Sequence, residues 1–442
     1  MLHVGSQGGG KPIKTMKMKI GTGYVDVSVP EKNLLGVIEK EAPASSLTEE
    51  EVITTALANP IGRPRLRDMV KPGESVCIVV SDVSRAWQRM NVFLPYIVKE
   101  LNDAGIADSH IKFLNAIGFH RTQTEEEHAR LLGEELAARF KMVDHDSQDK
   151  ANLVNLGTTS RGTPVTINKM ATDADHIVLT GCCTYHPWVG WGGGKKSLLP
   201  GISAFESIQH NHVMTMTDEI GGGQRSEVRN GNIVDNPVHL DMLEAADIVN
   251  PSFMFNVIMG HDGKIAHAIC GHYHEAHKVG CKIVDDLYSV PIDELADITI
   301  SSQGGFPKDI EFYQTGKAIY HTQDSVKPGG TMIILSECKE GLGPPDADTI
   351  FLGCSTTVER EQEVRNLFTV PKYVSYYICA AADKWNIIVV GSIDPGLVAK
   401  TPIKVAKTVE EALKIAFDKG GSDQTIYLMP QGSSALPVLR GS

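Results

Sequence analysis

Short apolar runs rich in valine and isoleucine recur along the chain, and each is followed by a polar or glycine-containing loop. Runs of this kind suit strands that are buried on both faces, as in parallel sheets. They predict that much of the chain forms parallel-type β-sheet. The runs are Ser75–Val80, Ile111–Ile117, His176–Thr180, Asp297–Ser301, Thr331–Leu335, Asn386–Val390 and Gln424–Leu428.

Helix signals lie between these runs. Thr124 is followed by glutamates, and Glu127 stands where it completes a capping box, so we expect a helix to begin at this point. The segment Thr408–Asp418 carries apolar residues at helical spacing and predicts a second helix. Strands that alternate with helices in this way indicate the α/β fold class.

The length of the chain favours two domains, because a single core stops growing well below 442 residues. A proline-containing stretch around residue 290 follows a long helical region and sets the expected boundary. We therefore expect an N-terminal α/β domain over residues 1–290 and a C-terminal α/β domain over residues 291–429. Residues 430–442 are candidates to return to the first domain.

Composition restricts the function classes. The chain has a formal net charge of −12, with 42% hydrophobic and 22% charged residues, so it lacks the basic footprint of a nucleic-acid binder. It contains no apolar run of about 18 residues, and residues 1–15 have no apolar core of a secretory signal. Its eight cysteines form no CxxC pair, which favours reduced thiols. We expect a cytoplasmic protein that binds neither nucleic acid nor membrane.

Polar side chains follow the predicted strands at the edge where parallel sheets bind ligands. The first strand leads into an aspartate and an arginine, and the second into a histidine. The third leads into a glycine-rich segment with a histidine and two lysines, and the fourth into a tyrosine, a glutamine and a lysine. Together they predict an anion site with two acid/base groups. The residues are Asp82, Arg85, His120, His186, Lys195, Lys196, Tyr313, Gln314 and Lys317.

The glycine-rich segment does not match a phosphate-binding Walker A loop. That motif needs glycine, four residues and then Gly-Lys-Ser/Thr. With Lys196 as the key lysine, position 195 must be glycine but is lysine; with Lys195, position 189 must be glycine but is Val189. A nucleotide-dependent transferase is therefore a disfavoured alternative. Gly193 and Gly194 still predict a close approach of backbone to a ligand, beside the alternative of a bare turn.

Histidines elsewhere give weaker metal signals. His210 and His212 are two residues apart on an expected helix, so they lie on different faces and only one can supply a metal ligand. The histidines of residues 267–277 have no standard zinc spacing, which favours a structural role. A non-catalytic metal-binding protein that uses this stretch remains an alternative.

The segment His186–His212, which reads HPWVGWGGGKKSLLPGISAFESIQHNH, closely resembles the signature of the nickel-dependent lactate racemase family. Four further motifs match in the same order along residues 82–317. Each motif is weak alone, but the ordered set is specific. These motifs are Asp82-x-Ser-Arg85, Gly118-Phe-His120-Arg121, Gly231-Asn-x-x-x-Asn-x-x-x-x-Asp241-Met, and Gly305-x-Pro-x-Asp309 with Tyr313-Gln314-x-x-Lys317.

The resemblance implies a cofactor. Family members carry a nickel-pincer nucleotide of the pyridinium-3,5-bisthiocarboxylic acid mononucleotide type, joined covalently to a lysine. By motif position, Lys196 is the tether and His212 the nickel ligand, while Asp82, Gly193 and Gly194 contact the cofactor. Soft sulfur donors with one imidazole suit square-planar nickel. The resemblance also implies an active site in the cleft between the two domains, and maturation proteins without which the cofactor is absent.

The implied activity is that of an isomerase, a racemase or epimerase of 2-hydroxy acids. The C2 hydride passes to the cofactor and returns through a planar 2-keto acid. His120 and His186 are the implied acid/base pair, one for each enantiomer. The implied substrate-binding residues are Arg85, Tyr313, Gln314 and Lys317.

The chain departs from the family pattern near the substrate. Ala86 and Trp87 follow Arg85 where lactate racemases typically have proline, and Trp188 and Trp191 make the next motif bulkier. The substrate therefore stays open between lactate and another 2-hydroxy acid such as malate, an aromatic hydroxy acid or a sugar acid. The oligomeric state also stays open.

Overall fold

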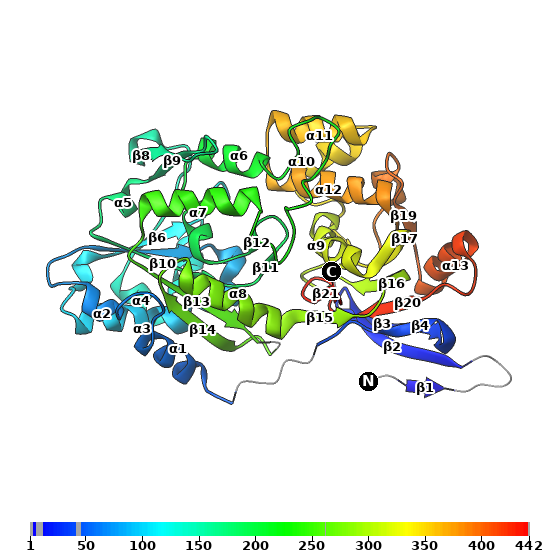
Figure 1. Cartoon of the computed structure of the whole chain (residues 1–442), viewed down its shortest axis with the longest axis horizontal. Coiled ribbons are helices and arrows are strands. Elements are labelled where there is room, and N and C mark those ends of the chain that lie inside the picture. The colour runs from blue at the N-terminus through cyan, green and yellow to red at the C-terminus, as the bar shows by residue number, and fades with distance from the viewer. Residues whose placement is uncertain (1–2, 6–11, 41–45, 261, 441–442) are drawn as a thin grey trace. The chain divides into compact units, whose positions relative to one another are not determined.

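The computed structural model describes residues 3–5, 12–40, 46–260 and 262–440. These residues form two compact units. One contains the described residues within 46–215 and 225–287, and we call it the central unit; the other contains those within 3–40, 216–224 and 288–440, and we call it the C-terminal unit. Both are α/β structures with parallel-type sheets (Figure 1), which confirms the expected fold class.

The central unit is built on a six-stranded sheet in the order β14-β13-β10-β5-β6-β7. All neighbouring pairs are parallel except β13 with β14 at one edge. The strands are β5 (Val76–Ser81), β6 (Ile111–Ala116), β7 (Met142–Asp144), β10 (His176–Cys182), β13 (Phe253–Met259) and β14 (Ile265–Gly271).

One face of this sheet packs on helices α1 (Glu49–Ala58), α3 (Met90–Asp103) and α4 (Glu125–Arg139) in a continuous apolar core. Thr124 and Glu127 form the predicted capping box at the start of α4. The other helices of this unit that bear on function are α6 (Phe205–Val213), α7 (Pro237–Val249) and α8 (Glu275–Tyr288).

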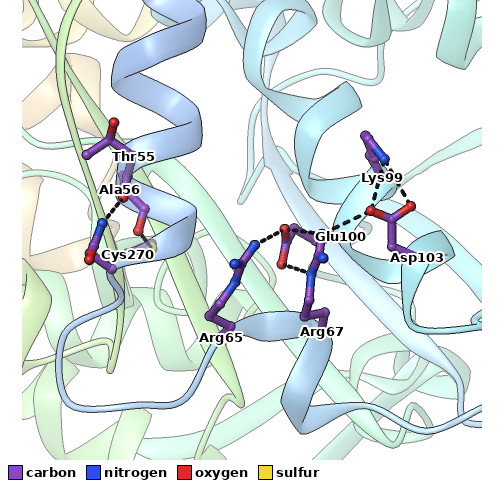
Figure 2. A network of polar contacts seen from close by, with 9 residues as sticks. Thr55, Ala56, Arg65, Arg67, Lys99, Glu100, Asp103 and Cys270 are labelled. Carbon is purple, nitrogen blue, oxygen red and sulfur yellow. Dashed lines mark hydrogen bonds and ion pairs between the residues drawn. The ribbon is translucent and has the colours of Figure 1, made fainter.

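A buried carboxylate joins α3 to the preceding short helix α2 (Leu66–Met69), as Figure 2 shows. Glu100, with a side chain only 7% exposed, accepts hydrogen bonds from Arg65 at 2.7 Å and from Arg67 at 2.7 and 3.0 Å. Two arginines neutralise the one buried charge, and Arg67 also reaches Asp103 at 2.9 Å. These ion pairs hold α2 against α3.

The C-terminal unit has an all-parallel sheet in the order β19-β18-β17-β16-β20-β4. The strands are β4 (Leu34–Val37), β16 (Ala296–Ser302), β17 (Val326–Leu335), β18 (Asn386–Val390), β19 (Lys404–Ala406) and β20 (Ile426–Met429). The antiparallel pair β2 (Ile13–Ile20) and β3 (Gly23–Pro30) and the helix α13 (Val409–Gly420) share an apolar core with it. Other elements of this unit are α9 (Phe312–Thr322), α11 (Thr357–Asn366), α12 (Val370–Lys384), β15 (Ser289–Ile292) and β21 (Leu436–Leu439).

The division of the chain differs from the expected domains at both termini. Residues 12–40 belong with the C-terminal unit, because β4 joins its sheet beside β20. Residues 430–440 stay in the same unit, because β21 pairs in parallel with β15. Residues 441 and 442 of the expected returning segment lie outside the described residues. Among the described residues, no helix is long and apolar enough to cross a membrane.

Candidate active site

Asp82 and His120 meet at the ends of two neighbouring parallel strands. Asp82 follows β5 and His120 follows β6, and these strands pair in register up to Ser81 opposite Ala116. The His120 Nδ1 lies 2.6 Å from Oδ2 of Asp82. A carboxylate only accepts, so Nδ1–H of His120 donates and the lone pair of the neutral ring is at Nε2. The His120 side chain is 44% exposed, whereas that of Asp82 is 6% exposed.

The Asp82 carboxylate also fixes the turn that carries Arg85. Its Oδ1 accepts from the Ser84 amide at 2.9 Å and from the Ser84 hydroxyl, and Arg85 donates to that hydroxyl at 2.8 Å. Burial alone would raise the pKa of Asp82, but the hydrogen bonds from His120 and Ser84 and the charge of Arg85 hold it below its usual value. Asp82 therefore stays ionised and orients His120.

His186 is held in a different way. It lies on β11 (Tyr185–His186), which pairs with β12 (Gly190–Trp191) in a short antiparallel ribbon. The Trp188 amide donates to Nδ1 of His186 at 3.2 Å. A neutral ring that accepts at Nδ1 carries its proton on Nε2. His186 thus presents a donor at the ring nitrogen where His120 presents an acceptor.

Lys196 is close enough to Asp82, Arg85 and His212 for their charges to affect one another. Burial and the nearby Arg85 charge lower the pKa of Lys196 to about 8, although Asp82 opposes this shift. Burial and the charge of Lys196 lower the pKa of His212 to about 3. His212 is therefore neutral at physiological pH, as a metal ligand must be. The edge-on ring of Trp188 lies 5.8 Å from His212 and 5.6 Å from His186 between centroids.

A chain of polar groups orients His212. Its Nδ1 lies 3.1 Å from Oδ1 of Asn211, which can only accept, so Nδ1 carries the proton and Nε2 the lone pair. Asn211 in turn donates to the buried Asp241 carboxylate at 2.8 Å. Asp241 also accepts from Thr159 at 2.6 Å and from Thr163 at 2.8 Å. Metal-ligating histidines are usually fixed through the second ring nitrogen in this manner.

Gly193 and Gly194 are shaped by protein contacts. Their φ angles are +81° and +57°, a region that favours glycine. A Cβ on Gly193 would lie 2.4 Å from Oδ1 of Asn256, a buried residue of β13. The Gly194 amide donates to the same oxygen at 2.6 Å. Asn256 therefore sets the loop that precedes Lys196, and contact of these glycines with a cofactor stays a prediction.

The two adjacent lysines face different surroundings. The Lys195 residue is 3% exposed, and burial lowers the pKa of its side chain to about 8, an effect that the thiols of Cys281 and Cys183 oppose. Lys196 instead interacts with Asp82, Arg85 and His212. Only Lys196 therefore lies among the other predicted site residues.

Three predicted substrate-binding residues lie in the C-terminal unit. Tyr313, Gln314 and Lys317 are on the first turns of α9, beyond the carboxyl end of β16. Gln303 fixes this helix start, because its side chain donates to the Gln314 carbonyl at 2.7 Å and accepts from the Ala318 amide at 3.2 Å. Their grouping with Arg85 and a site in a cleft between the domains stay predictions.

Sequence comparison assigns the family. Models described as the lactate racemase N-terminal domain and the lactate racemase C-terminal domain match residues 20–222 and 292–436. A lactate racemase from Thermoanaerobacterium thermosaccharolyticum is 30% identical over 438 residues, with 95% of this chain and 98% of the relative covered. The chain belongs to the lactate racemase family. A lactate racemase from Lactiplantibacillus plantarum is 29% identical, with 92% of this chain and 96% of the relative covered.

Solved structures agree with this assignment. The lactate racemase apoprotein from T. thermosaccharolyticum superposes with a TM-score of 0.87 at 29% identity, with 96% of this chain and all of that chain covered. A Thermotoga maritima protein shares the fold, with a TM-score of 0.63 at 18% identity over 90% of this chain and all of that chain.

Membership of the lactate racemase family confirms that the chain is an isomerase, a racemase. The alternative of a non-catalytic metal-binding protein is thereby wrong. The family implies nickel as the cofactor metal. The structure brings six of the predicted residues together in one unit. The sequence did not predict the hydrogen bond between Asp82 and His120, nor the hydrogen bonds by which Asn211 orients His212 and Asn256 holds the loop before Lys196. The six residues are Asp82, Arg85, His120, His186, Lys196 and His212.

Proposed function

We propose that this racemase interconverts the stereoisomers of a 2-hydroxy acid by hydride transfer at a Lys196-linked nickel-pincer nucleotide. The observation that carries the proposal is the pair of histidines with opposite resting tautomers. His120 presents a lone pair at Nε2 because Asp82 accepts from its Nδ1, and His186 presents Nε2–H because the Trp188 amide donates to its Nδ1. Both histidines belong to the unit that holds Lys196 and His212.

The residues fit the proposed cofactor. His212 is neutral, and its Nδ1–H bond to Asn211 leaves the lone pair on Nε2 for nickel. Lys196 has a pKa of about 8, so an appreciable fraction is the neutral amine that a covalent link requires. When bound, the nickel group supplies an acceptor and donor for the hydride at C2 of the substrate.

The two histidines handle the hydroxyl proton. His120 Nε2 takes the proton from the hydroxyl of one stereoisomer, and Asp82 stabilises the imidazolium that forms. His186 Nε2–H donates a hydrogen bond to the oxygen of the planar 2-keto acid. For the other stereoisomer, His186 gives up its bond from the Trp188 amide and moves its proton to Nδ1, so that its Nε2 becomes the base. In either direction the imidazolium returns its proton to the substrate oxygen once the hydride is back on C2, so that both rings end neutral.

The substrate is a small carboxylic acid. Arg85 offers a bidentate partner for its carboxylate, and we propose that Tyr313, Gln314 and Lys317 complete the site. Lactate is the substrate named for the relatives, and the alternative candidates are malate, an aromatic hydroxy acid and a sugar acid. We propose that Trp188 selects among these substrates, because its ring lies beside the rings of His186 and His212. Trp191 instead stacks on Tyr185, with 5.8 Å between ring centroids.

Further proposals follow from the cofactor. A nucleotide-derived group that is linked to a lysine requires dedicated maturation proteins, and we propose these as partners of the chain. Production without them gives a chain that carries no cofactor. We propose a cytoplasmic location, where the cofactor and these proteins are made.

Racemisation of C2-deuterated substrate tests the reaction. The chain, produced with the maturation proteins, is given one enantiomer of lactate, malate, an aromatic hydroxy acid or a sugar acid. We expect the opposite stereoisomer to keep deuterium at C2, because a hydride leaves and returns without exchange with water. Deuterium lost to solvent would contradict hydride transfer, and no turnover of any 2-hydroxy acid by nickel-loaded chain would contradict the substrate class.

A further inference from the structure

Two cysteines and a histidine form a buried cluster that the racemase reaction does not use. Cys183 directly follows β10, and His277 and Cys281 lie one turn apart on α8. All three are buried, with 1–3% of each residue exposed. Their possible ligand atoms all lie within 4.8 Å of one another, and this is the one such group among residues 12–40, 46–260 and 262–440.

The distances suit a tetrahedral ion. Cys281 Sγ lies 3.6 Å from Nδ1 of His277, and the thiols of Cys183 and Cys281 are hydrogen-bonded to each other. Zinc bonds of about 2.3 Å to sulfur and 2.1 Å to nitrogen, set tetrahedrally, place neighbouring ligand atoms about 3.6 Å apart. The cluster is therefore close to the ligand spacing of such an ion, and a turn of the His277 ring or of the Cys281 side chain closes it.

His277 carries its free lone pair on Nδ1. Its Nε2 lies 2.9 Å from the Gly192 carbonyl, which only accepts, so Nε2 carries the proton. The Cys281 Sγ lies 3.6 Å from Nδ1 and 4.0 Å from Nε2, so it is beside the ring and not in line with this lone pair. A backbone carbonyl that binds the second ring nitrogen is the usual partner of a metal-ligating histidine.

We propose that Cys183, His277 and Cys281 bind a thiophilic divalent cation of the Zn²⁺ class, at a site separate from Lys196 and His212. Two thiolates and one imidazole are three ligands of the types that zinc prefers, and a water molecule completes the tetrahedron. Binding releases the two thiol protons, so the ion and the two thiolates are together electrically neutral beside the buried Lys195.

The ion braces the loop that carries the predicted tether. The Gly192 carbonyl accepts from His277, and a Cβ on Gly194 would lie 3.1 Å from the His277 ring. A metal bond at Nδ1 fixes that ring, and through it the segment from Gly192 to Lys196. The cation therefore has a structural role, and binding does not require the nickel cofactor.

Cobalt substitution tests the site on the full-length chain. Chain purified under reducing conditions and stripped with a chelator is titrated with Co²⁺ and then Zn²⁺. We expect a thiolate-to-cobalt charge-transfer band that saturates at about one ion per chain and disappears on addition of Zn²⁺. No such band from reduced wild-type chain, or a Cys183–Cys281 disulfide that persists in reductant, overturns the proposal.

Variants locate the ion. Cys281→Ala should lose the band, whereas Cys379→Ala, which removes an equally buried thiol on α12, should keep it. His212→Ala should also keep the band, because His212 is the proposed nickel ligand and not part of this cluster. Loss of the band in Cys379→Ala or in His212→Ala contradicts the assignment.

Because Cys281→Ala can fail to fold, alkylation of wild-type chain gives a second readout. Zn²⁺ should protect Cys183 and Cys281, and equal labelling with and without Zn²⁺ overturns the proposal.

Discussion

Asp82 accepts a hydrogen bond from Nδ1 of His120 at 2.6 Å, across two neighbouring parallel strands. This bond fixes which ring nitrogen of His120 faces the reaction and supplies a negative charge for the protonated ring. In the proposed reaction Asp82 acts through His120 and is a positioning residue.

Asp82→Asn keeps the shape of the side chain and removes its charge. We expect kcat to fall roughly 100-fold or more in both directions, because the amide no longer enforces the His120 tautomer or stabilises the imidazolium. Initial rates on each stereoisomer, with nickel content matched, measure the effect. Asp173→Asn, on the exposed surface, should behave as wild type. An unchanged kcat for Asp82→Asn would mean that the pair is not part of proton transfer.

The two histidines are expected to be needed together. His120→Ala or His186→Ala should abolish turnover of both stereoisomers, because each direction uses Nε2 of His120 and Nε2 of His186. Single-enantiomer assays with chiral analysis of the product check this. A variant that racemises at the normal rate would show that the two-histidine scheme is wrong.

Asn211→Ala removes the acceptor of His212 Nδ1–H and one donor to Asp241. We expect nickel affinity to fall roughly 10- to 100-fold while the mass of the linked cofactor is unchanged. Nickel per chain, measured against intact mass, separates these two quantities. Asn155→Ala, on the exposed strand β8 (Leu153–Thr158), is the control. Equal nickel content in the two variants would show that Asn211 does not help His212 to bind nickel.

The pKa of Lys196 predicts when its amine reacts. Because this pKa is lowered from 10.5 to about 8, the neutral amine accumulates as pH rises through 8 and not near 10. Reductive methylation of cofactor-free chain, followed by peptide mass spectrometry, should give a Lys196 rate profile with a midpoint near 8. A profile that rises only above pH 10 would contradict the buried, cation-flanked environment of this lysine.

Gly193→Ala places a Cβ 2.4 Å from Asn256 at a φ of +81°. We expect a loss of about 1–3 kcal/mol in the free energy of unfolding, together with poorer cofactor loading. Thermal unfolding compared with Gly23→Ala, where a Cβ meets no atom within 4 Å, checks this. If the two variants unfold alike, the loop is not held as tightly as these contacts indicate.

The strands were the most predictable part of the fold, because burial on both faces leaves a local signal. The strand expected at Asn386–Val390 has those bounds, while β17 begins earlier, at Val326. The strand ends also identified Asp82 and His120, although the sequence did not reveal that they bond to each other. That pairing depends on β5 lying beside β6, which is a property of the sheet.

Long-range packing accounts for what the sequence left undetermined. Nothing in residues 34–37 indicates that this short strand joins a sheet formed mostly by residues after 295. In the Cys183–His277–Cys281 cluster only His277 and Cys281 are close in sequence, and Cys183 joins them because β10 and α8 pack together. Motif position already favoured Lys196 over Lys195, and the structure adds the physical difference between the surroundings of the two side chains.

The most direct test is the intact mass and nickel content of chain produced together with the cofactor maturation proteins. We predict a mass adduct and about one nickel per chain in wild type and in a Lys195→Arg variant, and neither in Lys196→Ala. No adduct and no nickel in wild type, or an adduct that persists in Lys196→Ala, would contradict the proposed function.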